Sequence, residues 1–224
     1  MTTTAPPGTK QRLSGMLYDE LRTRIITGHY PQGHRLIENE IAEEMRVSRI
    51  PVREALPRLA TDGFVQHLPR RGAQVTVWNS ALVDELFDAR LALEVRAALL
   101  AARRAPHDAA VRDQLDTQVR ATREAMRSPR SLEFATTHAQ LHQSLVDVAG
   151  NGILSSLMQA VAGRLTWMFH LTGQNDQSLA CAEHETIVDA IYSGNERLAE
   201  SRVYAHIEAG RAPGMAAIHT TVAP

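Results

Sequence analysis

The chain has 224 residues, of which 44% are hydrophobic and 22% are charged, with a formal net charge of −1; this composition supports buried cores and excludes a disordered chain. No run of about 18 uncharged apolar residues occurs, and the start MTTTAPPGTK has no apolar segment, so the sequence predicts neither a membrane span nor a secretory signal. Its single cysteine, Cys181, excludes an internal disulfide framework, and the expected location is the cytoplasm.

Basic residues are in surplus in the first third of the chain. Residues 1–78 contain 11 Lys and Arg against 8 Asp and Glu, whereas residues 79–224 contain 13 against 17. Lys10 is the only lysine, and the planar guanidinium of arginine suits phosphate groups and guanine edges. The surplus by itself is weak support for a nucleic-acid partner, because many solvated surfaces have a similar balance.

Residues 10–78 open with the pattern of a helix and a helix-turn-helix. The first predicted helix ends at Gly28, and its apolar face repeats every four residues through Leu13, Leu17, Leu21 and Ile25, with Met16 beside them. A short helix in LIENEIAEEM directs inward Ile41 and Met45, and the tight turn RVS follows it. A third helix, RIPVREALPRLATD, has on its buried side Val52, Leu56 and Leu59.

Two β-prone runs, FVQHL and AQVTVW, then flank the basic tip PRRG. A helix, a helix-turn-helix and a hairpin in this order predict a winged helix-turn-helix. Such a domain reads base edges in the major groove with the first turns of its third helix.

The third helix and the hairpin tip carry the candidate DNA-binding residues. Arg49 and Arg53 are four residues apart and point away from the apolar side, while Ser48 stands at the N-cap, where a phosphate can also bind. At the hairpin tip, Arg70 and Arg71 could reach the DNA backbone or minor groove, and Gly72 permits a close approach. The alternative is that these are solvated arginines on a small helical domain.

Residues 13–77 resemble the GntR-type winged helix-turn-helix, on the segments GHYPQGHRL, EIAEEM, VSRIPVREALPRLATDGF and RRGAQV. The resemblance implies that operator DNA is contacted by Ser48, Arg49, Arg53 and the wing residues Arg71 and Gly72, with Asn39 and Arg70 as further candidates. Two residues depart from the family pattern. Arg46 stands in a turn where the family often has glycine, and Pro57 falls inside the recognition helix, where it removes a hydrogen bond to the Arg53 carbonyl and is expected to kink the helix.

Residues 79–212 contain no convincing strand and predict an antiparallel bundle of about six helices. The first begins at a cap formed by Asn79 or Ser80, and the second opens with Pro106 in its first turn. The predicted ranges are about 80–104, 106–127, 130–149, 153–171, 178–192 and 196–209, with residues 211–224 as a loose tail. The fold class is therefore mainly α, with a small β wing.

Four of the ten histidines have a placement that suits a metal site. His138 and His142 are four residues apart on one predicted helix, so both rings point the same way. His184 and His206 lie at matching distances from the turn between the last two helices, so an antiparallel pair brings them to the same height. Neutral imidazole suits Zn²⁺, Ni²⁺, Cu²⁺ or iron. The alternative is a set of separate core or surface histidines.

Residues 80–210 resemble the all-helical FCD effector domain of the FadR subfamily of GntR regulators. The resemblance rests on LFDARLALEVRAALLAA, HAQLHQSLVDVAGN, EHETIVDAIYSGN and AHI. It implies a divalent metal bound by one Asp and three His, with a small carboxylate as effector. The three histidines match His142, His184 and His206, whereas His138 stands at the Asp position. Four neutral ligands favour Zn²⁺ or Ni²⁺ over harder ions and make the site more attractive to an anion.

Arg90, in the LFDAR segment, has two open interpretations. It could bind the anionic effector, or it could simply pair with Glu94 four residues on.

The resemblance thus implies a homodimeric transcriptional regulator, commonly a repressor, that binds a two-fold symmetric operator with one winged helix per half-site. A small organic anion would enter the helical domain and change operator affinity. Two alternatives stay open. One is a metal-dependent enzyme, although no positioned general base of the HExxH type is present. The other is a regulator whose metal is structural or is itself the signal.

Overall fold

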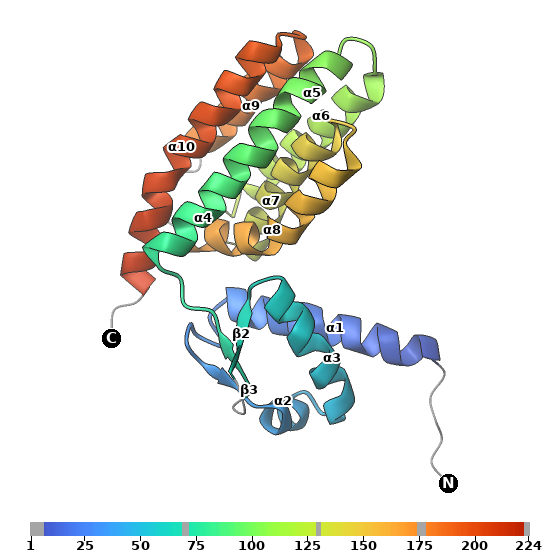
Figure 1. Cartoon of the computed structure of the whole chain (residues 1–224), viewed down its shortest axis with the longest axis vertical. Coiled ribbons are helices and arrows are strands. Elements are labelled where there is room, and N and C mark those ends of the chain that lie inside the picture. Colours follow the sequence, from blue (N-terminus) through green and yellow to red (C-terminus); the bar gives the residue numbers. More distant parts are fainter. Residues whose placement is uncertain (1–6, 69–71, 129–130, 174–177, 222–224) are drawn as a thin grey trace. The chain divides into compact units, whose positions relative to one another are not determined.

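The computed structural model divides the chain into two compact units, Met1–Val77 and Trp78–Pro224 (Figure 1). The structure describes residues 7–68, 72–128, 131–173 and 178–221. Among the described helices, none has the length and apolar character needed to cross a bilayer.

The first unit is a three-helix domain with a small antiparallel sheet. Its elements are α1 Pro7–Ile26, β1 Arg35–Leu36, α2 Glu38–Glu44, α3 Arg49–Thr61, β2 Val65–Leu68 and β3 Gly72–Val75. β3 lies between β1 and β2, so the predicted hairpin gains a third strand, which the sequence analysis missed. β1 pairs with β3 through Arg35 opposite Gln74 and Leu36 opposite Ala73. The architecture confirms the predicted winged helix-turn-helix.

The core of this unit corrects one detail of the first predicted helix. Leu17, Leu21 and Ile25 are buried, but Leu13 is 40% exposed and Met16 is 64% exposed. The buried face of α1 continues from Leu17 to Ser14, which is 5% exposed, so at this end of the helix it passes through Ser14 rather than Leu13.

The two departures from the family pattern have different outcomes in the backbone. Arg46 adopts a φ of 54°, the left-handed conformation that glycine adopts without strain. This explains why glycine suits that turn. α3 continues unbroken through Pro57 to Thr61. Pro57 and Arg53 both lie on the exposed side of the helix, where water can bond the freed Arg53 carbonyl.

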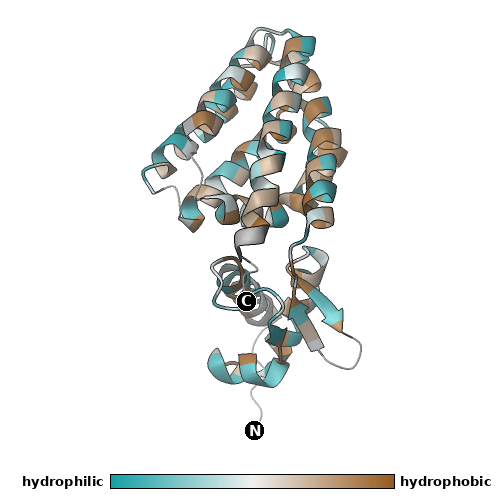
Figure 2. Ribbon diagram, turned by 90° about the vertical axis from the view of Figure 1, so that its left-hand side faces the viewer, coloured by the Kyte–Doolittle hydropathy of each residue, from teal (hydrophilic) through white to brown (hydrophobic). Residues whose placement is uncertain are grey.

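The second unit is a bundle of helices. The first rod is continuous: α4 Ser80–Arg90 passes into a π-helical turn, η1 Leu91–Val95, and then into α5 Arg96–Arg104. The remaining helices are α6 Ala109–Ala125, α7 Leu132–Asp147, α8 Gly152–Thr172, α9 Ser178–Tyr192 and α10 Glu196–Thr221. Side chains with almost no exposure, among them Phe134, Met158 and Trp167, form its core. Figure 2 shows apolar and polar residues alternating along these helices, as expected when one face of each helix is buried.

Two predicted boundaries in this unit were wrong. α6 begins after Asp108, whose carboxylate accepts from the Ala110 amide, so Pro106 lies in the preceding turn. α10 does not end near Gly210 but runs to Thr221, so most of the predicted loose tail is helical. The reason is close packing: a Cβ on Gly210 or Gly214 would lie 3.3 or 3.1 Å from the Phe87 ring of α4. These glycines allow α10 to approach α4 rather than ending the helix.

Side-chain caps fix the starts of several helices in the bundle. The Asn79 side chain accepts from the Leu82 amide, which confirms Asn79 as the cap of the first rod. Asn151 Oδ1 accepts from the amides of Ile153 and Leu154 at 3.1 and 3.2 Å. Asn151 therefore satisfies two N–H groups that would otherwise lack a partner inside α8.

Replacing Asn151 by alanine should lower the free energy of unfolding by about 1 kcal/mol, because both amide hydrogen bonds at the start of α8 are lost. Urea unfolding followed by circular dichroism measures this loss. Gln159→Ala, at an exposed position of the same helix, serves as the control and should change stability by less than about 0.5 kcal/mol. Equal stabilities for Asn151→Ala and the wild type would contradict the capping role.

Candidate metal centre and nucleic-acid interface

The exposed start of α3 carries the candidate base-reading residues. Ser48, Arg49 and Arg53 are all exposed. Arg49 Nη1 donates to Asn39 Oδ1 at 3.1 Å, and Arg53 Nε lies 3.9 Å from Glu38 Oε2. Ser48 occupies the N-cap position, but its side chain makes no capping hydrogen bond, contrary to the expectation from the sequence. Two residues of α2 thus orient the arginines, and the Ser48 hydroxyl is not used for capping.

Of the three candidate wing residues, Arg70 and Arg71 lie outside the residues that the structure describes. Gly72 begins β3 with a φ of 86°, and a Cβ there would lie 3.1 Å from the Leu36 carbonyl oxygen of β1. Glycine at position 72 is thus required by the close approach of two strands, which is a structural reason beside the one expected from DNA contact.

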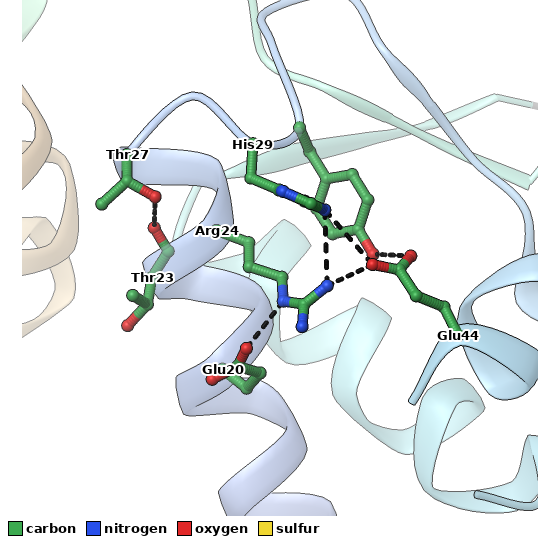
Figure 3. A network of polar contacts seen from close by, with 7 residues as sticks. Glu20, Thr23, Arg24, Thr27, His29 and Glu44 are labelled. Atoms are coloured by element: carbon green, nitrogen blue, oxygen red, sulfur yellow. Dashed lines mark hydrogen bonds and ion pairs between the residues drawn. The ribbon is translucent and has the colours of Figure 1, made fainter. Parts of the chain in front are cut away.

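A polar network links the end of α2 to α1 and to the loop that follows α1 (Figure 3). Arg24 of α1 donates to Glu20 on its own helix and to Glu44 of α2. The Tyr30 hydroxyl donates to the second Glu44 oxygen at 2.7 Å, and burial together with this carboxylate raises the pKa of Tyr30 to about 12. His29 Nε2 lies 3.2 Å from the same carboxylate. Glu44 is thus the common partner of three side chains from the first helix and the loop after it.

The four histidines singled out in the sequence come together in the second unit. His138 and His142 lie on α7, His184 on α9 and His206 on α10, and all four are buried. One nitrogen atom from each lies within 4.8 Å of the others, and His184 Nε2 is 3.1 Å from His206 Nε2. We call this group the four-histidine cluster. The convergence expected from the antiparallel arrangement is therefore present.

The nitrogen atoms of the cluster have the chemistry that a metal ion needs. Both ring nitrogens of His138 and Nδ1 of His184 are buried without a hydrogen-bond partner, which costs free energy in a folded protein. Burial holds the pKa of both imidazoles well below the usual range, and it lowers the pKa of His142 to about 4 despite the nearby Glu94 carboxylate. The rings of His138, His142 and His184 are neutral at pH 7 and can coordinate without first losing a proton. The residues fit a divalent ion that prefers nitrogen ligands.

Two carboxylates orient the outer sides of the cluster. Glu94 Oε2 lies 2.6 Å from His142 Nδ1, and Glu183 Oε2 lies 2.7 Å from His206 Nδ1. When each Nδ1–H donates to its carboxylate, each Nε2 keeps its lone pair, as in the usual support of a metal-bound histidine. In this structure His142 Nε2 lies 3.3 Å from Arg90 Nη2, and His206 Nε2 faces His184, so a bound ion would replace these contacts. The sequence analysis did not assign this role to either glutamate.

Arg90 pairs with Glu94, as one of its two interpretations predicted, and it also lies beside the four-histidine cluster. Its Nε donates to Glu94 Oε1 at 2.8 Å, and its Nη2 is 3.2 Å from His142 Nδ1. Arg90 and Glu94 are 2% and 0% exposed, so a complete ion pair is buried beside the histidines. The charges of Arg90 and Glu94 neutralise each other beside His142. Burial alone would raise the pKa of Glu94, but the Arg90 guanidinium and His142 outweigh it and lower this pKa to about 2.

A cavity of about 150 Å³ opens beside the cluster. It is lined by Phe87, Arg90, His138, Met168, Phe169, Thr172, Leu179, Ala180, Glu183, His206, Ala209, Gly210 and Pro213. Two histidines of the cluster therefore face a space that a small molecule can enter.

Comparison with known proteins decides the family. Residues 13–75 match the bacterial regulatory proteins of the gntR family, and residues 85–209 match the FCD domain. The chain belongs to the GntR family. A GntR head followed by an FCD domain is the architecture that the sequence resemblance predicted. This GntR protein is a transcriptional regulator and not an enzyme, so the metalloenzyme alternative is set aside.

Relatives along most of the chain agree with this assignment. The GntR protein is 34% identical to an HTH-type transcriptional regulator in an unstable DNA locus of Streptomyces ambofaciens, over 86% of this chain and 81% of the relative. It is 28% identical to a probable D-xylose utilization operon transcriptional repressor of Paenarthrobacter nicotinovorans, over 93% and 92%. A crystal structure of a GntR regulator from Rhodococcus sp. RHA1 covers 93% of this chain and 98% of that one, with a TM-score of 0.75 and 23% identity. The last likeness concerns the fold alone.

Proposed function

We propose that this GntR protein is a homodimeric repressor whose operator affinity is controlled by a small carboxylate bound beside a metal ion. The observation that carries the proposal is the four-histidine cluster, whose His138 and His206 open onto a cavity that also contains Arg90. A metal site and an anion site are thereby adjacent in the domain that the family places after its DNA-binding head.

The metal would be held by His138, His142, His184 and His206. Four imidazole ligands suit Zn²⁺ or Ni²⁺, and His138 in place of a carboxylate disfavours Mg²⁺ and Mn²⁺. When bound, such an ion supplies positive charge at a cavity wall that otherwise carries carboxylates. Arg90 remains a candidate effector-binding residue because it lines the cavity while it pairs with Glu94.

DNA would be bound by two copies of the head, one per half-site of a symmetric operator. Ser48, Arg49 and Arg53 are the candidate contacts from α3, with Asn39 orienting Arg49 from α2. Gly72, Arg70 and Arg71 are the candidate wing residues. Repression is favoured over activation by the repressor name of the Paenarthrobacter relative, which matches over nearly the whole chain.

The direct test measures operator affinity of the metal-loaded and the metal-free protein with and without small carboxylates. The proposal expects that at least one carboxylate weakens operator binding by the metal-loaded protein and has no effect on the metal-free one. If chelation unfolds the helical unit and no carboxylate changes DNA binding, the metal is structural. If DNA affinity follows metal concentration alone, the metal is the signal.

Arg49→Ala should weaken binding to the operator by about 5- to 150-fold, since an arginine that contacts a base edge contributes about 1–3 kcal/mol. Titration of labelled operator DNA, selected by the protein from a random pool, measures the loss. Arg202→Ala serves as a control because Arg202 is an exposed arginine of α10. Equal affinities of Arg49→Ala and Arg202→Ala would remove Arg49 from the interface.

Glu183→Ala should lower Zn²⁺ affinity by about 10- to 100-fold, because the His206 ring loses the carboxylate that orients it. Competition with a chromophoric chelator measures this affinity. Glu185→Ala, two residues away on the same helix, removes an exposed glutamate that pairs with Arg123 and should leave the affinity unchanged. Identical affinities for the two variants would show that His206 needs no such partner.

A further inference from the structure

The walls of the cavity beside the four-histidine cluster are of two kinds. The polar part of the lining is the cluster itself and its partners. His138 and His206 belong to the cluster, Arg90 contacts His142, and Glu183 contacts His206. Most of the other lining residues are apolar, among them Phe87, Met168, Phe169 and Ala180, and Thr172 is the polar exception. A ligand therefore meets polar groups where it touches the cluster and hydrocarbon elsewhere.

The hydrocarbon wall offers few hydrogen-bond partners to a polar body. Phe87 and Phe169 lie beneath the Arg90 guanidinium, with the Arg90 Cζ at 5.2 and 5.5 Å from their ring centroids. Phe169 also stacks on His138 with ring centroids 3.9 Å apart. Hydroxyl groups of a bound sugar acid would face these rings without hydrogen-bond partners, which disfavours the binding of such an acid.

Formal charge limits the number of carboxylates that the ligand carries. The ion-pairing side chains around the cluster are one arginine, Arg90, and two glutamates, Glu94 and Glu183, which gives a formal charge of −1. A divalent ion in the cluster would change this balance to +1. One carboxylate then neutralises the site, whereas a second would bring another negative charge toward Glu183 on the cavity wall.

The volume limits size. A closed apolar cavity of about 150 Å³ accommodates a molecule such as benzene, so a cavity of this volume takes a ligand on the order of six to nine non-hydrogen atoms. The body of a larger acid would extend beyond this lined volume.

We propose that the effector of this regulator is a monocarboxylate with a compact apolar body, of the size of benzoate or hexanoate, and that polyhydroxy acids and dicarboxylates are poor effectors. This inference rests on the proposed function, because it names the class of carboxylate that the same site selects. The carboxylate lies at the cluster and Arg90, and the body lies against Phe87, Met168 and Phe169.

Calorimetric titration of the full-length Zn²⁺-loaded protein tests the proposal with four probes: benzoate, hexanoate, gluconate and succinate. Benzoate or hexanoate should bind at least about tenfold more tightly than gluconate and succinate, and the better of the two should weaken operator binding. Benzyl alcohol, which has the apolar body without the charge, should bind at least about tenfold more weakly than benzoate. These ratios correspond to about 1.4 kcal/mol each.

The outcomes separate this inference from the proposed function. Tighter binding of gluconate or succinate, with an effect on operator affinity, overturns the apolar monocarboxylate and leaves carboxylate control intact. If no carboxylate binds the Zn²⁺-loaded protein, carboxylate control itself fails.

A cavity-filling variant tests the location. Ala180→Leu adds a larger side chain to the lining and should weaken benzoate and hexanoate about tenfold while leaving operator affinity unchanged. Ala182→Leu, at an exposed position on the same helix, should leave both unchanged. Unaltered benzoate binding by Ala180→Leu, in a protein that folds and holds Zn²⁺ as the wild type does, places the ligand elsewhere and overturns the proposal.

Discussion

Glu94→Ala should lower the free energy of unfolding by about 3–5 kcal/mol, a large change for a single substitution. Glu94 has no exposure, and its two oxygens accept from Arg90 Nε at 2.8 Å and face His142 Nδ1 at 2.6 Å. Removing the carboxylate leaves the Arg90 guanidinium charged, buried and without its ion-pair partner. Urea unfolding of the metal-free protein measures the loss without a contribution from metal binding.

Two companion variants make this result specific. Glu85→Ala removes an exposed glutamate of α4 and should have little effect on stability. The double variant Arg90→Met with Glu94→Met removes both charges and should be much less destabilised than Glu94→Ala, because no buried charge is left unpaired. A double variant as unstable as the single one would show that the loss comes from packing rather than from charge.

The same carboxylate predicts a pH dependence. The Glu94 pKa is lowered to about 2 from an ordinary value of 4.5, because Arg90 and His142 together outweigh the effect of burial. A carboxylate whose pKa is lower in the folded state stabilises the protein above pH 4.5, and this contribution declines as the pH falls toward 2. The stability difference between the wild type and Glu94→Ala should therefore shrink over this interval.

His184→Ala should abolish stoichiometric binding of Zn²⁺, with a loss of affinity above about 100-fold, since loss of an outer partner alone costs 10- to 100-fold. His184 provides one of four imidazoles, and its Nε2 lies 3.1 Å from His206 Nε2 at the centre of the cluster. Metal content after purification without a histidine tag, followed by chelator competition, measures this effect. Operator affinity should be retained while the response to carboxylate is lost.

His107→Ala is the matched control for this variant, because His107 is an exposed histidine of the same unit. It should keep one ion per chain and the wild-type affinity. A wild-type protein that takes up no Zn²⁺ or Ni²⁺ when these are supplied would refute the metal centre while leaving the DNA-binding assignment intact.

Much of the fold follows from periodicity, and the exceptions have local causes. The apolar spacing of Val52, Leu56 and Leu59 correctly predicts the buried side of α3. β1 is only two residues long, too short for an alternating pattern to be recognised. The predicted end of α10 was wrong because a glycine such as Gly210 can either end a helix or allow close packing. Only the position of the Phe87 ring shows that Gly210 allows close packing.

The cluster was predictable because its geometry depends on position along helices. Two histidines four residues apart, and two at equal distance from a turn, must meet if the helices pack antiparallel. The roles of Glu94 and Glu183 were not predictable in this way. Glu183 precedes His184 in the chain yet contacts His206 of another helix, and Glu94 contacts a histidine 48 positions away. Such contacts depend on the rotation of each helix about its axis, which spacing alone does not determine.

Both tryptophans of the chain belong to the helical unit, where the Trp78 and Trp167 rings meet edge to face with centroids 5.7 Å apart. The DNA-binding unit contains tyrosines but no tryptophan. Selective excitation of indole emission therefore reports on residues of the helical unit. Because Trp167 directly precedes the cavity residues Met168 and Phe169 in α8, this intrinsic signal offers a label-free way to follow ligand entry.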